Sequence, residues 1–371
     1  MLRLNRLAPF VGALVAGLAA GCGQDSGPVV VGAVGPWHLT FLQKARMAIE
    51  LAVEEVNAAG GIRGRQLVVT FANDSGDAER AAGIAGQFVA DRRIVASLGP
   101  INSGALLAAS RVYDGRLPTV SPISVSPDLS GISEWVFRLM TNDSVFAIAV
   151  GERATRLGRR AAIVFDNNSF GRGGAEAFRR HYRGAIVSYD PVESGSPDME
   201  PFVSFYKQRR VDLVYVAGVA TTGVSFLRER QRQRFAGAVL GSDTWASVIP
   251  DSAFGEGAYI AARFSIRDPR SEVQRFAAAF RDRFGVEADG IAAFAYDAAH
   301  LLARAMISRG PRRRAIRDFL ASLDSTNTWP GVTGPIGFTR EGDPTNRSFA
   351  LMQVRGGSLV LLEGGGGQSI R

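Results

Sequence analysis

The sequence predicts an α/β protein with two lobes, each built on a doubly wound parallel sheet. Short apolar runs rich in Val, Ile and Ala alternate with longer amphipathic segments, the pattern of strands alternating with helices, and this alternation occurs twice along the 371 residues. Roughly 340 residues follow the N-terminal leader, which suits two domains better than a single core. The hydrophobic content of 46% excludes a disordered chain.

The clearest βαβ unit joins the strands expected at 94–98 and 117–121. Asn102 and Ser103 are both good N-cap residues for the Ala- and Leu-rich helix between these strands. Parallel neighbours place the loops that follow them side by side, at the edge where open α/β sheets bind ligands, and the helix start favours an anionic group there. The alternative is that these polar residues only cap helices.

The first lobe is expected to contain four strands and three helices. Its strands are short β-branched runs that end in turn residues, and its helices carry apolar residues at helical spacing. The first helix stops at Gly60-Gly61, and the second begins after the polar turn at 74–77. In chain order we expect a strand at 29–34, a helix at 42–58, a strand at 66–72, a helix at 78–91, a strand at 94–98, a helix at 104–113 and a strand at 117–121.

The second lobe repeats this order, and the last third of the chain adds helices before strands. The same periodicities predict helices at 142–157, 173–182, 199–209 and 220–233 and strands at 161–165, 185–189, 213–216 and 238–240. Amphipathic helices are expected at 271–284, 288–308 and 312–322, followed by a strand at 334–338 and a hairpin over 348–362. Helices followed by late strands indicate that the chain recrosses between the two lobes.

The N-terminus is expected to be a targeting segment rather than part of the fold. Two arginines precede an apolar run at 7–21, which is too short to span a bilayer comfortably and ends in small residues before Cys22. A lone cysteine after Ala-Ala-Gly resembles a bacterial lipobox, so residues 1–22 are read as a lipoprotein signal peptide and residues 23–28 as a tether. The protein is then expected to be secreted across the cytoplasmic membrane and lipid-anchored in the envelope. The alternative is an ordinary signal peptide with an incidental cysteine.

The composition argues against several other classes of protein. The net charge is +8, carried almost entirely by arginine, but the arginines spread around helices without interleaved aromatic residues, which favours a solvated surface over a nucleic-acid site. The three histidines show no metal-ligand spacing, and no phosphate-binding loop or nucleophile elbow occurs. We therefore expect no enzyme activity, no catalytic residues, no metal and no cofactor.

Asp243 follows the strand expected at 238–240 and offers a negative charge at a loop. This charge suits an ammonium group, whereas the alternative role is an N-cap.

Four segments together resemble one family. They are 53–68, which contains Asn-Ala-Ala-Gly-Gly-Ile-Arg-Gly, 98–103, 120–129 with its Ser-Pro-x-x-x-Ser-Pro-Asp-Leu, and 163–171, which ends in Phe-Gly. In their order and spacing, from about residue 29 to 362, they resemble type I periplasmic solute-binding proteins of the branched-chain amino acid ABC transporter class.

The resemblance implies two lobes joined by a three-crossover hinge, which close on a small solute and deliver it to an ABC permease. It assigns residues 29–140 plus 264–326 to the N-terminal lobe, 141–263 plus 327–362 to the C-terminal lobe, and 363–371 to a flexible tail. Hinge residues are expected near Met140–Asn142, Ala262–Ser265 and Ser325–Trp329.

The resemblance also implies roles for individual side chains. Ser103 and the loop at Ile123–Val125 would hold a ligand carboxylate, Asp243 would hold the ammonium, and Phe170 would cover the ligand. The complete expected set is Trp37, His38, Asn102, Ser103, Ile123, Ser124, Val125, Phe170, Thr221 and Asp243.

Two of these residues depart from the family pattern, since Val125 replaces a usual threonine and Phe170 lacks a tyrosine hydroxyl. We therefore expect an amino-acid-like ligand in a less polar site, and a permease of the branched-chain amino acid type as partner. The alternative is a ligand-responsive sensor or envelope interaction protein of the same fold.

Overall fold

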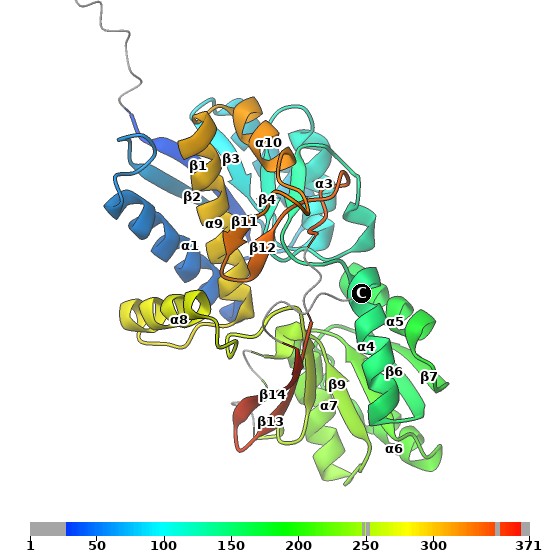
Figure 1. The fold of residues 1–371 in the computed structure, drawn as a ribbon. Helices are drawn as coiled ribbons and strands as arrows, with labels where there is room; N and C mark the ends of the chain where they lie inside the picture. The colour runs from blue at the N-terminus through cyan, green and yellow to red at the C-terminus, as the bar shows by residue number, and fades with distance from the viewer. Residues whose placement is uncertain (1–26, 247–248, 250–252, 346–348, 365–371) are drawn as a thin grey trace, which may run out of the picture.

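The computed structural model describes residues 27–246, 249, 253–345 and 349–364, which form two α/β lobes (Figure 1). The predicted fold class is confirmed, because each lobe carries a sheet with helices on both faces. The expected signal peptide, Cys22, residues 23–26 of the tether and residues 365–371 of the tail lie outside the described residues.

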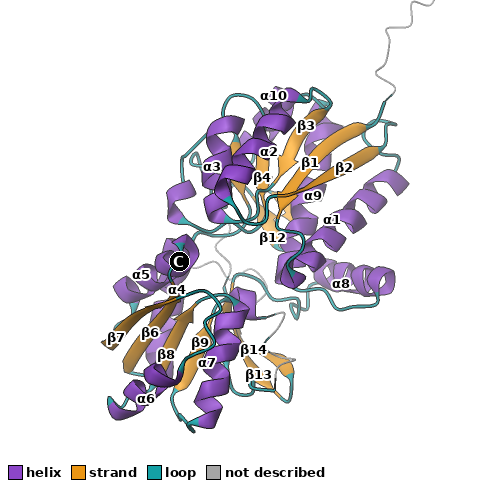
Figure 2. Cartoon of the chain, turned by 180° about the vertical axis from the view of Figure 1, so that it is seen from behind, coloured by secondary structure: helices purple, strands orange, loops and turns teal. Residues whose placement is uncertain are grey.

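The first sheet has five parallel strands in the order β2-β1-β3-β4-β5. Its strands are β1 (Val29–Gly35), β2 (Leu67–Asn73), β3 (Ile94–Leu98), β4 (Thr119–Ser121) and β5 (Val136–Arg138). One face is covered by α1 (Thr40–Ala58), α8 (Ser271–Phe284) and α9 (Gly290–Arg309), and the other by α2 (Ala78–Ala90) and α3 (Ser103–Tyr113) (Figure 2). The strand order reverses between β1 and β3, so the loops after these strands flank the switch point of the sheet.

The second sheet has seven strands in the order β14-β13-β10-β9-β8-β6-β7. They are β6 (Arg160–Asp166), β7 (Ala185–Val192), β8 (Leu213–Ala217), β9 (Ala238–Gly241), β10 (Tyr259–Ala262), β13 (Ala350–Arg355) and β14 (Ser358–Gly364). Helices α4 (Asp143–Leu157) and α5 (Ser169–His181) pack on one face, and α6 (Glu200–Gln208) and α7 (Ala220–Arg232) pack on the other. β13 pairs antiparallel with both β10 and β14, whereas the other described pairings of this sheet are parallel, and the switch point lies between β6 and β8.

Most expected elements occur within a few residues of their predicted bounds, and the differences have local causes. Helix α5 starts four residues before the expected 173, because the Asn168 side chain accepts a hydrogen bond from the Gly171 N–H and caps the helix there. The short strands β5 and β10 were not predicted, since each has only three or four residues and carries too little of a periodic pattern. Two residues assigned to the flexible tail, Glu363 and Gly364, pair in β14.

The third crossover lies later in the chain than predicted. The hairpin of β11 (Trp329–Gly331) and β12 (Gly334–Ile336) packs on the first lobe, where Val332, Ile336 and Phe338 join its core. The fully buried Asp297 of α9 accepts hydrogen bonds from the N–H groups of Val332 and Thr333 at 2.8 and 2.7 Å. Thr345 still bonds to Gly337, whereas Phe349 lies in the core of the second lobe. Residues 327–345 therefore belong with the first lobe, which corrects the assignment of 327–362 to the second and the hinge expected near 325–329.

Candidate functional site

The two polar loops of the first lobe meet as the sequence predicted. Ser103 begins α3, is 9% exposed, and its hydroxyl oxygen accepts the N–H groups of Val125 and Ser126 at 3.2 and 3.1 Å. The loop before α3 needs a glycine at position 99, where φ is +82° and a Cβ would lie 2.3 Å from the Val34 carbonyl oxygen. Because the Ser103 oxygen accepts in both bonds, its hydrogen remains available for a further acceptor.

The loop after β4 continues with Ile123, Ser124 and Val125, whose side chains are buried or packed against the core. Ser124 is fully buried, and its hydroxyl donates to the Ile101 carbonyl at 2.7 Å, so its side chain fastens the two loops together instead of facing a ligand. Val125 is buried in the first-lobe core, and Ile123 packs against that core. The side chains of Ser124 and Val125 are therefore buried within the lobe, and the Val125 main chain is bonded to Ser103 and Asp143, whereas Ile123 is partly exposed.

The Trp37 side chain packs within the first lobe. Its indole N–H donates to the Ala72 carbonyl at 3.0 Å, its ring packs edge-on against Phe71, and only 7% of the residue is exposed. The place of Trp37 at the ligand site stays a prediction, with its ring held by these contacts. His38 is exposed next to it, and Asn102, at the N-cap position of α3, makes no side-chain cap bond.

In the second lobe, buried Asp166 organises the loops around the switch point. Its carboxylate accepts the hydroxyl groups of Ser194 and Thr222 and the N–H of Val219, at 2.7 to 2.9 Å. Phe170, on the first turn of α5, reaches the hydrophobic core of the opposite lobe and packs there half-buried. Thr221 is exposed at the start of α7.

Asp243 belongs to an ion cluster that sequence reasoning did not identify. Arg263, directly after β10, is 2% exposed and pairs with Asp243 and Asp143, with both N–O distances 2.6 Å. Its Nε donates to the Thr141 carbonyl, also at 2.6 Å, and its guanidinium lies over the Phe146 ring. Asp243 is therefore not an N-cap, since Ser242 occupies that position, and its charge is already paired with an arginine.

The ion cluster of Asp143, Asp243 and Arg263 carries one net negative charge when both carboxylates are ionised. Burial would by itself lower the pKa of Arg263, but the two carboxylates outweigh it and raise that pKa. Burial raises the pKa of Asp143 to about 6, and the negative charge of Asp243 adds to the effect. The Asp143 Oδ2 has no hydrogen-bond partner within the described chain. The arrangement favours an additional cation or hydrogen-bond donor nearby.

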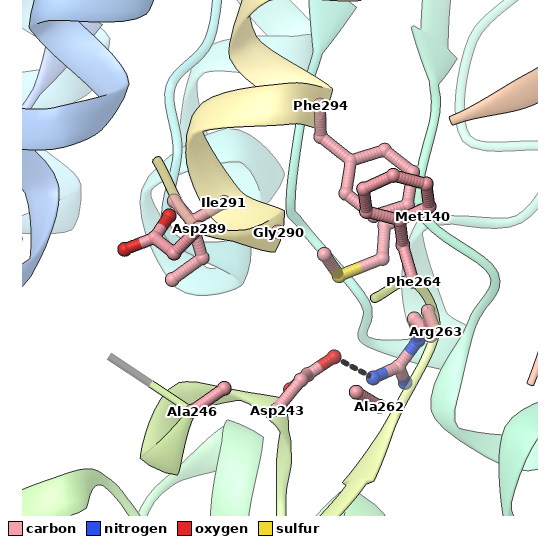
Figure 3. A pocket seen from close by; sticks show the side chains of 10 residues that line it. All are labelled: Met140, Asp243, Ala246, Ala262, Arg263, Phe264, Asp289, Gly290, Ile291 and Phe294. Atoms are coloured by element: carbon pink, nitrogen blue, oxygen red, sulfur yellow. Dashed lines mark hydrogen bonds and ion pairs between the residues drawn. The ribbon is translucent and has the colours of Figure 1, made fainter. Parts of the chain in front are cut away.

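A pocket of about 330 Å³, counted with the open space at its mouth, lies where two crossovers pass between the lobes (Figure 3). Asp243, Ala246, Arg263 and Asp289 contribute its polar and small surfaces. Its apolar wall consists of Met140, Phe264, Ile291 and Phe294. Of the ten side chains expected at the ligand site, only Asp243 lines this pocket. Ser103 and Phe170 are not among its lining residues.

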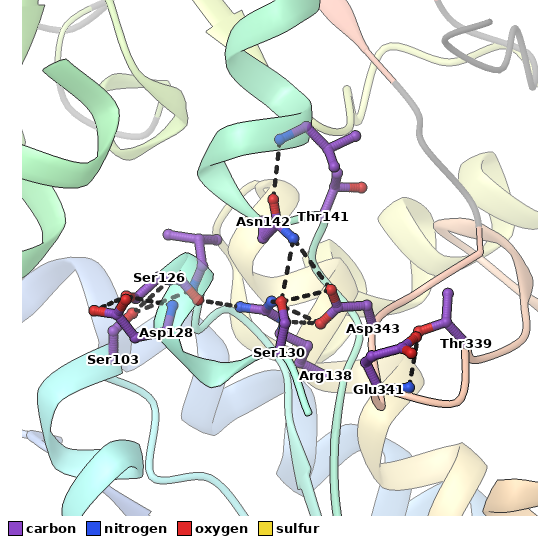
Figure 4. A network of polar contacts seen from close by, with 12 residues as sticks. Ser103, Ser126, Asp128, Ser130, Arg138, Thr141, Asn142, Thr339, Glu341 and Asp343 are labelled. Carbon is purple, nitrogen blue, oxygen red and sulfur yellow. Dashed lines mark hydrogen bonds and ion pairs between the residues drawn. The ribbon is translucent and has the colours of Figure 1, made fainter. Parts of the chain in front are cut away.

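A second polar network ties the first crossover to the segment that returns from the β11–β12 hairpin (Figure 4). Arg138 Nε donates to Asp343 at 2.6 Å, and its Nη1 donates to the Ser126 carbonyl at 2.6 Å. Asn142 donates to the other oxygen of Asp343 at 3.1 Å while its own oxygen caps α4. The network thus links the Ser103–Ser126 loops of the first lobe directly to the first helix of the second.

Arg263 and Asp143 are the main residues that sequence reasoning missed. A signal for Arg263 was present, because it is the only charged residue in the otherwise apolar run Tyr259–Phe264. A charge at the end of an apolar strand indicates a buried partner. Asp143 carried no such signal, since an acidic residue in the first turn of a helix is ordinary.

The described residues contain neither a helix with the length and apolarity of a membrane span nor a group of three potential metal ligands.

Comparison with known proteins assigns a family. A family model described as periplasmic binding protein matches residues 28–358. The Leu/Ile/Val-binding protein BraC3 of Rhizobium johnstonii is 26% identical over 353 residues, covering 90% of this chain and 94% of that protein.

Solved structures of similar proteins agree with this match. An ABC transporter substrate-binding protein from Desulfitobacterium hafniense in complex with Leu superposes with a TM-score of 0.79 at 28% identity, covering 90% of this chain and all of that chain. A second structure is the branched-chain amino acid transporter substrate-binding protein LivJ from Streptococcus pneumoniae in complex with isoleucine. It gives a TM-score of 0.80 at 22% identity and covers 90% of this chain and 100% of that chain. At this identity the match supports the fold alone.

Proposed function

The chain belongs to the periplasmic binding protein family, and from this premise we propose that it captures a small amino-acid-like ligand between its two lobes for an ABC importer. The family consists of extracytoplasmic solute-binding proteins rather than enzymes. The observation that carries the proposal is the ion cluster at the pocket between the lobes, where a net negative charge lies beside an apolar wall. This combination suits the ammonium and the aliphatic side chain of an amino acid.

The opposite end of the ligand is proposed to bind at the loops joined by Ser103. The hydroxyl hydrogen of Ser103 and the first turn of α3 together suit a carboxylate. Asn102, Phe170, Thr221 and His38 are proposed to line the remaining space, Phe170 through its contact with the opposite lobe. The relative from Desulfitobacterium hafniense, whose structure contains Leu, supports an aliphatic amino acid as the first ligand to test.

A thermal-shift screen tests this proposal. Aliphatic amino acids, aromatic amino acids and their deaminated acids should be compared at equal concentration. A ligand at about a hundred times its dissociation constant adds roughly 2.7 kcal/mol to the free energy of unfolding, which gives a clear rise in melting temperature. Stabilisation by a carboxylic acid that lacks the amino group, with none by any amino acid, would contradict the ammonium assignment.

Ligand binding is expected to close the two lobes around the crossovers near Met140–Asn142 and Ala262–Ser265. Hinges absorb such rotations at a few residues between rigid elements, and these segments connect the two sheets. Small-angle scattering should therefore give a smaller radius of gyration at saturating ligand. An unchanged profile under saturation would exclude closure of this kind.

We also propose that Cys22 is lipidated, because Ala19-Ala20-Gly21 precedes it. Fatty-acid labelling in a bacterial host should mark the wild-type chain, whereas Cys22→Ala should abolish the label and release the protein from the membrane fraction. A diacylated cysteine supplies the two chains that stable attachment requires. An unlabelled wild-type protein would rule out the anchor.

A further inference from the structure

Six exposed arginines gather at one edge of the first lobe, where its strands begin. They lie in the connections before β3 and β4, in the last turn of α3, at the end of α9 and at the start of α10 (Arg313–Ala321). These residues, which we call the basic edge, are Arg92, Arg111, Arg116, Arg309, Arg312 and Arg314. Figure 1 places α10 and the upper end of α9 at this edge, beside the start of β1 and away from the second lobe.

Contacts of the neighbouring Arg313 hold several of these residues close together. Its guanidinium donates to the carbonyl of Asp91 at 2.8 Å and to the carbonyl of Arg116 at 3.5 Å. It therefore joins the start of α10, the segment before β3 and the segment before β4. Arg92, Arg116, Arg312 and Arg314 lie on or next to these joined segments.

The surroundings of the basic edge offset only part of its charge, through exposed Asp114, which accepts a hydrogen bond from Ser133. Nearby Asp91 pairs with Arg93, and Glu134 pairs with Arg317. Over the described part of the chain, no carboxylate forms an ion pair with any of the six arginines. Their charges therefore face solvent and reinforce one another at low ionic strength.

Stability of the fold does not account for these residues either. Arg312 and Arg314 lie at the N-cap and in the first turn of α10, which contains no acidic residue. The helix dipole makes this terminus positive, so cations there are unfavourable. An external anionic partner would explain why the positions carry arginine.

The start of the described chain lies at the same end of the lobe. Arg65 Nε donates to the Gly27 carbonyl at 2.6 Å, and its neighbour Arg63 donates to the Ile307 and Ser308 carbonyls at the end of α9. The ligand loops after β3 and β4 leave the opposite edge of the sheet. A surface bound at the basic edge would thus leave the candidate ligand site uncovered.

We propose that the basic edge binds the anionic phospholipid surface of the membrane. The six residues from Gly23 to Pro28 can span at most about 20 Å, so an anchored Cys22 would keep this edge near the bilayer. Clustered basic residues next to a membrane are attracted to anionic headgroups over about one Debye length. The tether and the basic edge would then hold the same end of the first lobe at the membrane.

The test uses the chain that begins at Gly23, which retains all the described elements and carries no lipid. Its binding to phosphatidylglycerol-containing vesicles and to pure phosphatidylcholine vesicles should be measured by co-sedimentation at low salt. We expect binding only to the anionic vesicles, and its loss in high salt. The variant Arg92→Glu/Arg312→Glu/Arg314→Glu should bind at least tenfold more weakly.

A matched control removes the same number of exposed arginines elsewhere, as Arg180→Glu/Arg267→Glu/Arg340→Glu. This control should keep most of the vesicle binding, and the melting temperature of each variant checks its fold. Equal losses in both variants would reduce the effect to net charge and overturn the proposal. Binding to duplex DNA without binding to anionic vesicles would overturn it as well, in favour of a nucleic-acid partner. Because no lipidated chain or solute is used, neither result depends on the proposed function.

Discussion

Replacing Arg263 with methionine should lower the free energy of unfolding by about 3–5 kcal/mol at neutral pH, because removing one partner of a buried ion pair leaves the other charge uncompensated. Arg263 is 2% exposed and is the shared partner of two carboxylates, Asp143 and Asp243. Methionine fills a similar volume but supplies no donor to either carboxylate or to the Thr141 carbonyl. Denaturant unfolding of both proteins gives the difference directly.

The pH dependence identifies the cause of this loss. Without Arg263, the pKa of Asp143 should rise further, because burial then acts without the opposing guanidinium charge, so the folded variant binds this proton more tightly than the unfolded chain. A carboxyl group with a raised folded pKa does not lower the free energy of unfolding below the unfolded pKa of about 3.9. It lowers that free energy increasingly as the pH rises from about 3.9 through the folded pKa. The defect should therefore shrink between neutral pH and pH 4.

Two further variants separate charge from packing. The triple change Arg263→Met/Asp143→Asn/Asp243→Asn should recover much of the lost stability, because it removes the stranded charges together. Arg283→Met, which breaks the exposed ion pair with Glu54 and a contact with the Phe284 ring, should leave stability nearly unchanged. A single Arg263→Met variant as stable as wild type at neutral pH would show that the ion cluster does not stabilise the fold.

Replacing Asp243 with alanine should weaken binding of an amino-acid ligand by about 30-fold or more. Removing one partner of a buried charge pair costs roughly 2–5 kcal/mol, and about 1.4 kcal/mol is a factor of ten. The structure adds a second reason, since loss of Asp243 leaves Arg263 facing the pocket with only Asp143 to neutralise it. An arginine released in this way would repel the ligand ammonium. Calorimetric titration with the best ligand from the thermal-shift screen measures the effect.

Two milder changes provide the comparison. Asp243→Asn keeps an acceptor but loses the charge, so its affinity should fall between wild type and Asp243→Ala. Ser103→Ala removes one hydroxyl bond to the carboxylate, worth roughly 1.5–3 kcal/mol, while the start of α3 remains. Because that hydroxyl also accepts two loop N–H groups, its stability should be measured alongside. Unchanged affinity in Asp243→Ala would limit Asp243 to neutralising Arg263 and remove the basis for an ammonium site.

Local patterns were sufficient for most of the fold. Strand β3 and helix α8 occur at their predicted bounds, because an apolar run between turns and an amphipathic run with a glycine stop are signals carried within a few residues. The convergence of Ser103 with the loop after β4 also followed from sequence, since adjacent parallel strands always bring their following loops together. These features depend only on short-range periodicity and on the topology that it implies.

The sequence by itself determined the α/β class, the order of the elements and the polar loops at the strand ends. Only the tertiary structure decided how the charged and aromatic side chains of those loops are used. The Trp37 indole N–H donates to the Ala72 carbonyl, and this bond holds the ring inside the first lobe. The β11–β12 hairpin packs on the first lobe because its N–H groups donate to the buried carboxylate of Asp297. Asp243 is paired with Arg263, which lies 20 residues away in the chain, directly after β10. Burial and pairing energies depend on which groups share a low-dielectric space, and that is a property of the packed chain that no local pattern contains.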